Sequence, residues 1–252
     1  MKKTFALLII IILSVFSLLP SASFALYGPK ITEIGNKHNL SYGNSGVTYK
    51  ATDPNDPRGR QICIFCHTPH NAVSSRALWN RRDTIQSFGH YSSSGLHINE
   101  DLKAASGYNE PNGSSRLCLS CHDGVMALGA VVNGPQYGGS DVAINGSTNT
   151  AMAGANVFDR VKMTNSHHPV SFNYAGTVQS TLATIGNYKL PPPGSNVRLD
   201  KEGRMQCTTC HDPHQTRDTA LPFWVWEDTG DINNSSHDAV CKTCHNVVYP
   251  KF

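Results

Sequence analysis

Hydrophobic residues along this 252-residue chain gather into short runs, separated by polar stretches that are rich in glycine and proline. The longest run, Phe5 to Leu19, follows Lys2 and Lys3 and precedes a group of small residues, which is typical of a cleaved secretory signal. A membrane anchor is the alternative, but the run is short for a bilayer span and no basic stop-transfer segment follows it. We therefore predict a signal peptide at 1–25 and a secreted mature chain at 26–252, with no membrane span after cleavage.

The rest of the pattern predicts only short elements. The segment "VRLDKEGRMQC" alternates apolar and polar residues around a glycine turn, which favours a β-hairpin leading to Cys207. The segments "NGPQYGGSDVAINGSTNT" and "KLPPPGSN" have the composition of loops. Long stretches are poor in aliphatic residues, so a core built from side chains alone would be thin. Something other than side chains is expected to fill it.

The charge of the chain argues against a nucleic-acid partner. The full sequence has a formal charge of +3, and removal of the signal with its two lysines lowers this to about +1. A nucleic-acid-binding surface needs a strong basic excess, which the mature chain lacks.

Cysteine and histidine form the strongest pattern in the chain. All eight cysteines fall into four Cys-x-x-Cys pairs, each followed at once by histidine: "CIFCH" (63–67), "CLSCH" (118–122), "CTTCH" (207–211) and "CKTCH" (241–245). With 12 histidines among 252 residues, the chance probability of four such coincidences is on the order of 10⁻⁵ to 10⁻⁶. Four disulfides would suit an exported chain, and zinc sites also use paired cysteines, but neither requires a histidine after every pair.

Covalent haem attachment does require that histidine. In a c-type haem two vinyl groups become thioethers to two cysteines, and the iron takes an imidazole on the same side. Two cysteines on one helical turn present their sulfurs in the same direction, and the next residue can reach the iron. We therefore predict four covalent haem c groups attached through Cys63, Cys66, Cys118, Cys121, Cys207, Cys210, Cys241 and Cys244. Their proximal iron ligands are His67, His122, His211 and His245.

Two of the motifs carry a second histidine after a proline, His70 in "CHTPH" and His214 in "CHDPH". Such a ring cannot easily be the sixth ligand of its own haem, because that ligand lies on the opposite porphyrin face and the tether is only three residues long. Pro69 and Pro213 also turn the chain out of helix. We predict that His70 and His214 each bind the iron of a neighbouring haem, which brings two haems close together. A solvated loop histidine is the alternative.

Two more distal ligands are needed for four six-coordinate irons. In "NSHHPVSF" we prefer His168 to His167, because Pro169 favours an extended conformation that can push the ring into the core. His38, in a turn-rich N-terminal segment, is the fourth candidate, and His237 is the reserve.

Other side chains are weaker candidates for the iron. His90 and His97 lie in a Ser/Gly-rich loop and are expected at the surface. Methionine ligands would give iron of higher potential, but the surplus of histidine favours bis-histidine coordination. The methionines considered are Met126, Met152, Met163 and Met205.

Four haems change the expected architecture. They supply the apolar core that the polypeptide lacks and constrain the unfolded chain, so the apoprotein should be largely unfolded. We predict a mostly irregular multihaem c-type cytochrome fold with short helices around the CxxCH motifs, the one at the last motif ending near Val248, and a few short β-hairpins, packed on four haems. Trp79 and the "FWVW" segment, Phe223–Trp226, are expected to pack on the haems.

These segments resemble a known group. "CIFCHTPHNA" with "LWNR", then "SSRLCLSCHDG", "NSHHPVSFNY", "RLDKEGRMQCTTCHDPH" and "VCKTCHN", are similar to the doubled-CxxCH multihaem c-type cytochromes, from about His38 to the C-terminus. Within that group, a secreted tetrahaem chain of this size resembles the OmcE-type extracellular cytochromes, whose subunits polymerise into haem-wire filaments. The resemblance implies bis-histidine haems with His70, His168 and His214 as distal ligands, and a homopolymer.

Three functional classes compete: an electron carrier, a multihaem reductase, and a structural or adhesive protein stapled by haem. A reductase needs an open iron site and commonly an altered attachment motif, whereas all four motifs here end in histidine. We expect a non-enzymatic electron carrier, secreted to the cell surface or outside the cell as a polymerising nanowire subunit. Its partners would be redox proteins or extracellular electron acceptors, and a soluble periplasmic shuttle is the alternative.

His38 bears on this choice. It lies in a Tyr/Gly/Ser-rich arm that offers little means of packing against its own chain. We hypothesise that His38 completes a haem in a neighbouring protomer, with ligation inside its own chain, by His38 or by His237, as the competing arrangement.

Overall fold

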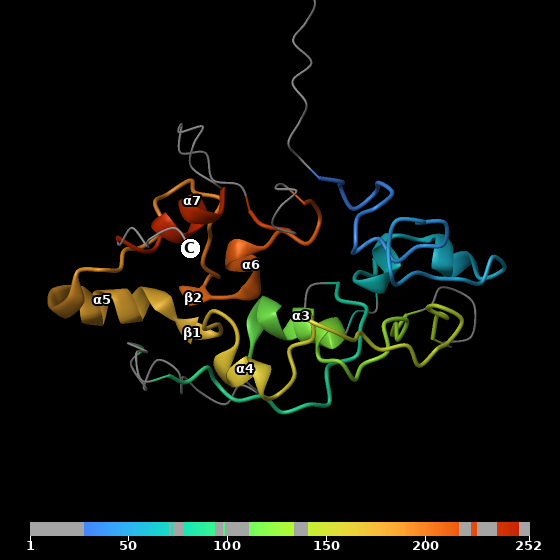
Figure 1. Cartoon of the computed structure of the whole chain (residues 1–252), viewed down its shortest axis with the longest axis horizontal. Helices are drawn as coiled ribbons and strands as arrows, with labels where there is room; N and C mark the ends of the chain where they lie inside the picture. Colours follow the sequence, from blue (N-terminus) through green and yellow to red (C-terminus); the bar gives the residue numbers. More distant parts are fainter. Residues whose placement is uncertain are drawn as a thin grey trace, which may run out of the picture.

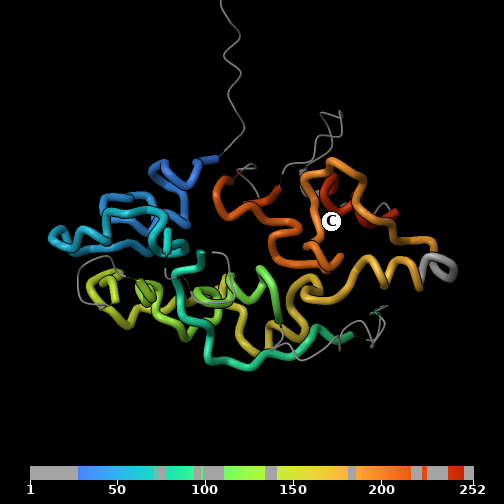
Figure 2. The backbone as a smooth tube through the Cα atoms, turned by 180° about the vertical axis from the view of Figure 1, so that it is seen from behind, coloured from blue at the N-terminus to red at the C-terminus, as the bar shows by residue number. Residues whose placement is uncertain are grey.

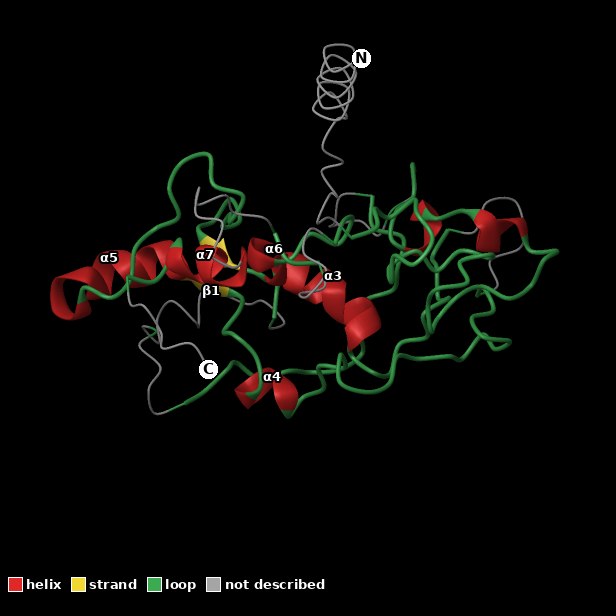
Figure 3. Ribbon diagram, turned by 45° about the horizontal axis from the view of Figure 1, so that its top comes forward, coloured by secondary structure: helices red, strands yellow, loops and turns green. Residues whose placement is uncertain are grey.

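The computed structural model describes residues 28–70, 72, 78–93, 98, 111–133, 141–216, 223–225 and 236–246, which form a mostly irregular chain (Figures 1 and 3). The helices and 3-10 turns of this part are η1 (Pro57–Arg60), η2 (Cys63–Phe65), α3 (Gly113–His122), α4 (Lys162–Asn165), α5 (Tyr174–Ile185), α6 (Cys207–Cys210) and α7 (Ser236–Lys242). None of these helices is long and apolar enough to cross a membrane. The predicted signal peptide at 1–25 lies outside the described residues.

A short helix or turn accompanies every attachment motif, as predicted. The first motif begins on η2, the second is the C-terminal half of α3, the third coincides with α6, and the fourth starts at the end of α7. One detail was wrong, because α7 ends at Lys242 rather than near Val248, which lies outside the described residues. The two segments predicted as loops are irregular wherever they are described.

The described residues contain one two-stranded sheet, in which β1 (Phe172–Asn173) pairs antiparallel with β2 (Arg204–Met205). The glycine turn before β2 forms, since the amide of Gly203 donates to the carbonyl of Asp200 at 2.9 Å. The predicted local hairpin is wrong, because β2 takes its partner from far upstream. This pairing puts Phe172 opposite Met205 inside one buried cluster, and their contact stabilises the sheet. A hairpin formed within 197–207 would not make this contact.

Helix α5 was not predicted. It begins where the side chain of Asn173 accepts a hydrogen bond from the amide of Gly176 at 2.8 Å, an N-cap. It ends at Gly186, whose φ of 64° is the left-handed conformation that glycine adopts most readily. Both signals are legible in the sequence, but no clear hydrophobic periodicity accompanied them.

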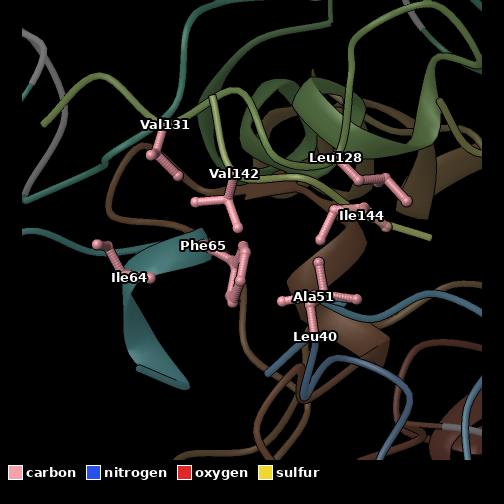
Figure 4. Close-up of a cluster of buried hydrophobic side chains, with 8 residues drawn as sticks. All are labelled: Leu40, Ala51, Ile64, Phe65, Leu128, Val131, Val142 and Ile144. Carbon is pink, nitrogen blue, oxygen red and sulfur yellow. The ribbon is translucent and has the colours of Figure 1, made fainter. Parts of the chain in front are cut away.

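Two hydrophobic clusters lie on opposite sides of the centrally placed α3 (Figures 1 and 2). The first contains Leu40, Ala51, Ile64, Phe65, Leu128, Val131, Val142 and Ile144, and Figure 4 shows Phe65 projecting toward the segments that carry Ala51 and Val142. The second contains Phe172, Tyr174, Val178, Val197, Met205, Val225, Val240 and Cys244. Attachment cysteines border both: Cys121 packs against the first cluster and Cys210 against the second. The polypeptide core is therefore small and divided, as expected for a chain that folds around other groups.

Polar contacts join α3 to α6, and so the second motif to the third. The hydroxyl of Ser115 donates to Oε1 of Gln206 at 2.7 Å and accepts from the amide of Cys207 at 3.0 Å. Nε2 of Gln206, a buried residue, donates to Oδ1 of Asn112 at 2.9 Å. Because each of these buried groups has a partner, the two attachment sites are held in a fixed relation.

The close approach of Gly129 to Val142, a residue of the first cluster, can be tested by substitution. A Cβ atom at this position would lie 1.8 Å from the carbonyl oxygen of Val142, and the amide of Val142 donates to the carbonyl of Gly129 at 2.9 Å. Gly129→Ala should therefore destabilise the folded protein by about 3 kcal/mol or more, because the backbone itself must move. Denaturant unfolding of the haem-loaded protein measures this.

The control for this change is Gly146→Ala. Nothing lies within 4 Å of a Cβ at Gly146, although its φ of 84° disfavours alanine. It should cost only about 1 kcal/mol. Equal losses for the two variants would show that the close approach of Gly129 to Val142 contributes nothing.

Candidate functional site

The histidine of the first motif is held beside a tryptophan by a short backbone bridge. His67 and Trp79 form an isolated antiparallel bridge, in which the amide of Thr68 donates to Leu78 at 2.8 Å and the amide of Asn80 donates to Cys66 at 2.9 Å. The rings of His67 and Trp79 lie edge to face, with centroids 5.7 Å apart and an interplanar angle of 90°. This contact fixes the orientation of the imidazole.

The third motif repeats this arrangement. His211 and Trp224 form the equivalent bridge, with ring centroids 5.0 Å apart at 81°. The residue before each tryptophan has a positive φ, 55° at Leu78 and 60° at Phe223, which is uncommon for residues of this type. The likeness of 63–70 to 207–214 in the sequence therefore extends to a tryptophan turn that follows each motif.

The other two motif histidines also have aromatic neighbours. His245 forms a bridge with Tyr188, and their ring centroids lie 5.2 Å apart. The ring of Phe158 lies 6.4 Å from that of His122, whose carbonyl accepts from the Phe158 amide at 2.7 Å. The sequence predicts aromatic packing by Trp79 and Phe223–Trp226. It does not predict the contacts of Tyr188 and Phe158, because each of these residues meets its histidine only through the tertiary fold. Trp226 lies outside the described residues.

Three of the motif histidines each face a second histidine. The pairs, with their centroid separations and interplanar angles, are His67 with His214 (6.2 Å, 13°), His122 with His38 (6.1 Å, 87°) and His245 with His168 (6.4 Å, 72°). A metal–imidazole bond of about 2 Å would put the centres of two rings bound on opposite sides of one ion about 6 Å apart. The three separations fit one iron between each pair.

The remaining ring nitrogens of these pairs also suit metal ligands. Nδ1 of His122 lies 2.9 Å from the carbonyl of Asn156, Nδ1 of His38 lies 2.9 Å from that of Pro213, and Nδ1 of His168 lies 2.9 Å from that of Pro169. Nδ1 of His214 lies 3.4 Å from the carboxylate of Asp212. A ligating histidine commonly donates its second N–H in this way, which leaves Nε2 for the metal.

Burial keeps several of these imidazoles in the neutral form that binds metals. It lowers the pKa of His38 to about 4 and is the main cause of the lowered pKa values of His122, His168 and His245. The pKa of His67 is lowered for the same reason. Neutral imidazole is the ligand form at neutral pH, so no proton has to be displaced.

The choice between His167 and His168 can be made from their contacts. Nε2 of His167 lies 2.8 Å from the carbonyl of Met163, so this nitrogen is turned to the backbone. The ring of His168 has Nδ1 at the carbonyl of Pro169 and faces His245. These contacts favour His168, the preferred candidate, although His168 is exposed and the expectation that Pro169 pushes its ring into the core was wrong.

Within the single chain, His38 contacts residues of its own chain. It is half-buried, its ring stacks on that of Phe223 with centroids 4.0 Å apart, and it faces His122. The arm around it is also packed, since Asn36, Asn39 and Leu40 are buried. The expectation that this arm packs poorly was wrong. The packing favours the in-chain alternative, and ligation of a haem in a neighbouring protomer stays a prediction.

The other histidines are less well placed. His70 is exposed, and its carbonyl accepts from Thr68 Oγ1 at 2.7 Å. Its predicted role as the distal ligand of a neighbouring haem stays a prediction. His90 is half-buried rather than at the surface. His97 and the side chain of His237 lie outside the described residues.

The cysteines are available for haem attachment, and two of the methionines are placed in the hydrophobic core. All eight cysteines are free thiols, and Met163 and Met205 lie buried in hydrophobic clusters. Thiols of neighbouring motifs interact: a hydrogen bond to Cys207, together with burial, raises the pKa of Cys118. Burial raises the pKa of Cys210 to about 12, and the fourth-motif thiols add to the effect. The four attachment sites therefore lie close to one another.

Covalent haem fits these residues. Each motif offers two free thiols and an oriented imidazole, and three motifs have a facing imidazole at a suitable distance. The buried indole Nε1 of Trp79, next to His67, has no acceptor among the described residues, so a donor remains for a group outside the polypeptide.

Comparison with known proteins agrees for the C-terminal part. Residues 201–248, which contain the third and fourth motifs, match the doubled CXXCH motif family. That match is consistent with a multihaem c-type cytochrome and implies covalent haem c at these motifs. No curated protein sequence matches the chain significantly.

Proposed function

We propose that this protein transfers electrons through four closely spaced, covalently attached, bis-histidine haems. Haems 1 to 4 are numbered by the four motifs in chain order. The proposed distal ligands are His214 for haem 1, His38 for haem 2, His70 for haem 3 and His168 for haem 4. When bound, haem iron supplies a reversible one-electron ferric–ferrous couple.

The observation that carries this proposal is the set of three facing histidine pairs, separated by 6.1 to 6.4 Å. Six-coordinate iron has no open position for a substrate, which favours electron transfer over a multihaem reductase. Low potentials are expected, because two imidazoles stabilise ferric iron better than histidine with methionine does.

The doubled motif supports close spacing between haems. His214 follows His211 by three residues, yet its ring is parallel to that of His67. One short peptide thus provides ligands to two irons. Electrons could then pass between neighbouring haems without leaving the protein.

The finer proposal concerns location and assembly. The N-terminal apolar run and the resemblance to OmcE-type cytochromes support a secreted, polymerising subunit that conducts electrons to extracellular acceptors. A soluble periplasmic shuttle would use the same four haems. Because His38 faces His122 of its own chain, the proposed filament does not rest on a shared haem ligand, and its assembly would depend on protein contacts and on close approach of the terminal haems of adjacent subunits.

The test uses the purified haem-loaded protein. Denaturing mass spectrometry should show four retained haems, electron paramagnetic resonance should show low-spin iron, and a redox titration should reduce all four haems at low potential. A mass without haem would end the proposal. One stoichiometric high-spin haem that binds small ligands would support a reductase instead. Native size and electron microscopy separate a filament from a shuttle.

A further inference from the structure

Arg81 is a buried cation in the segment that joins the first two motifs. It is 1 % exposed, and its guanidinium donates four hydrogen bonds, all to backbone carbonyls. Nε and Nη2 donate to Ser120 at 3.2 and 2.9 Å, Nη1 donates to Leu128 at 2.7 Å, and Nη2 also donates to Ala127 at 2.8 Å. Four of the five N–H donors are therefore used, and the group is held rigidly.

The charge of Arg81 is not neutralised by an ion pair within the described part of the chain. Arg116 is also buried, but its Nε lies 2.9 Å from the carboxylate of Asp83. Arg82, the next residue, is 58 % exposed and lies 3.6 Å from Asp141. Carbonyl dipoles satisfy the hydrogen bonds of Arg81 without cancelling its positive charge, and burial limits the screening of that charge by water.

Arg81 lies between two haem attachment sites. The amide of the preceding residue, Asn80, donates to Cys66 at 2.9 Å, and its side chain donates to Ile64 at 2.8 Å, both in the first motif. Ser120, which accepts two bonds from Arg81, is in the second motif between its cysteines. Asn80 therefore hydrogen-bonds to the first motif, and Arg81 hydrogen-bonds to the second.

The positive charge acts on both motifs. Burial raises the pKa of Cys66 to about 12, and Arg81 opposes that rise. Burial also raises the pKa of Cys121, and Arg81 is the largest opposing influence there. At the second motif a negative charge competes, because the buried carboxylate of Asp123 follows His122 directly and favours the protonated thiol of Cys121.

We propose that Arg81 is a potential-determining residue, which raises the reduction potentials of haem 1 and haem 2. Reduction adds one negative charge to the iron centre, and a fixed, unscreened cation nearby stabilises the reduced state. The inference rests on the proposed function, since it requires haem at both motifs. It also gives the chain an uneven sequence of potentials, with the N-terminal pair of haems accepting electrons more readily.

The test compares Arg81→Gln, Arg81→Met and Arg81→Lys with wild type, and Arg82→Gln is the matched control. Redox titrations are followed by electron paramagnetic resonance. Near-parallel imidazole planes separate the iron d orbitals and give a rhombic signal, whereas near-perpendicular planes give a highly anisotropic one. The 13° pair of His67 and His214 therefore identifies haem 1 among the three described pairs.

The neutral variants should make haem 1 at least tenfold harder to reduce, a shift of 59 mV for one electron, and should shift haem 2 in the same direction. Arg81→Lys should stay near the wild-type potential, although it cannot make all four hydrogen bonds, and Arg82→Gln should leave both potentials unchanged. Four low-spin haems with unshifted potentials in the neutral variants would overturn the inference while leaving the proposed function intact.

A neutral variant could fail to load four haems. In that case a redox titration of the wild-type protein tests the role of Arg81. The rhombic signal must disappear within the first two of the four reduction steps. Its disappearance in the last two steps would refute the role of Arg81. Absence of haem from the wild-type protein would instead refute the proposed function.

Discussion

Replacing His214 by alanine should turn one haem high-spin, and that haem should be haem 1, attached through Cys63 and Cys66, rather than haem 3, attached beside the mutated residue. The reason is geometric, because the ring of His214 is parallel to that of His67 and its centroid lies 6.2 Å away. Loss of this ring leaves the iron of haem 1 with one axial ligand. Electron paramagnetic resonance should therefore show a new high-spin signal and loss of the rhombic low-spin signal.

Two controls make this result specific. His167→Ala should leave all haems low-spin, because Nε2 of His167 lies 2.8 Å from the carbonyl of Met163 and is turned to the backbone. In a chain that lacks haem 1 through replacement of Cys63 and Cys66, His214→Ala should create no further high-spin iron. If haem 3 is the one that changes spin state, the exchange of ligands between the doubled motifs is refuted.

Replacing His38 by alanine should make haem 2 high-spin in the isolated monomer as well as in any polymer. His38 faces His122 of its own chain at 6.1 Å, and its Nδ1 is fixed by the carbonyl of Pro213. Because the half-buried ring stacks on Phe223, its removal should leave a space beside the iron of haem 2. Added imidazole should enter that space and restore the low-spin optical spectrum, whereas it should have no effect on wild type.

The contrary outcome for His38 is equally clear. A wild-type monomer with one high-spin haem, which becomes low-spin only on assembly, would mean that the ligand comes from another subunit. If wild type forms filaments and His38→Ala does not, without a spin change in the monomer, the result would point the same way.

Much of the site could be predicted because its chemistry is local in the sequence. Two cysteines and a histidine must be adjacent to attach one haem, so the four motifs could be read directly, and so could the short helices that carry them. Pro169 favoured His168 over His167, and the contacts of the two rings agree with that choice, although His168 is exposed and not in the core. The tether length likewise directed His214 away from its own haem.

The contacts that could not be predicted join distant segments. Tyr188 packs against His245, and β1 pairs with β2. In both pairs, no local sequence signal in either partner predicts the contact. The arm around His38 looked unable to pack because it is polar, but its asparagines fold it through side-chain bonds to the backbone, such as Asn44 Nδ2 to Asn39 at 2.7 Å. Buried polar networks of this kind replace apolar packing and leave no hydrophobic pattern in the sequence.

The bond between His38 and the Pro213 carbonyl spans 175 positions of sequence. The neighbouring amide of Ile31 donates to His214 at 2.6 Å, so the N-terminal arm rests on a segment close to the C-terminus. The arm around His38 is synthesised early and the segment at Pro213 and His214 late. Contacts between segments so far apart in the sequence form slowly. If His38 is the distal ligand of haem 2, as proposed, that ligand cannot take its place until the third attachment motif and Pro213 have been synthesised.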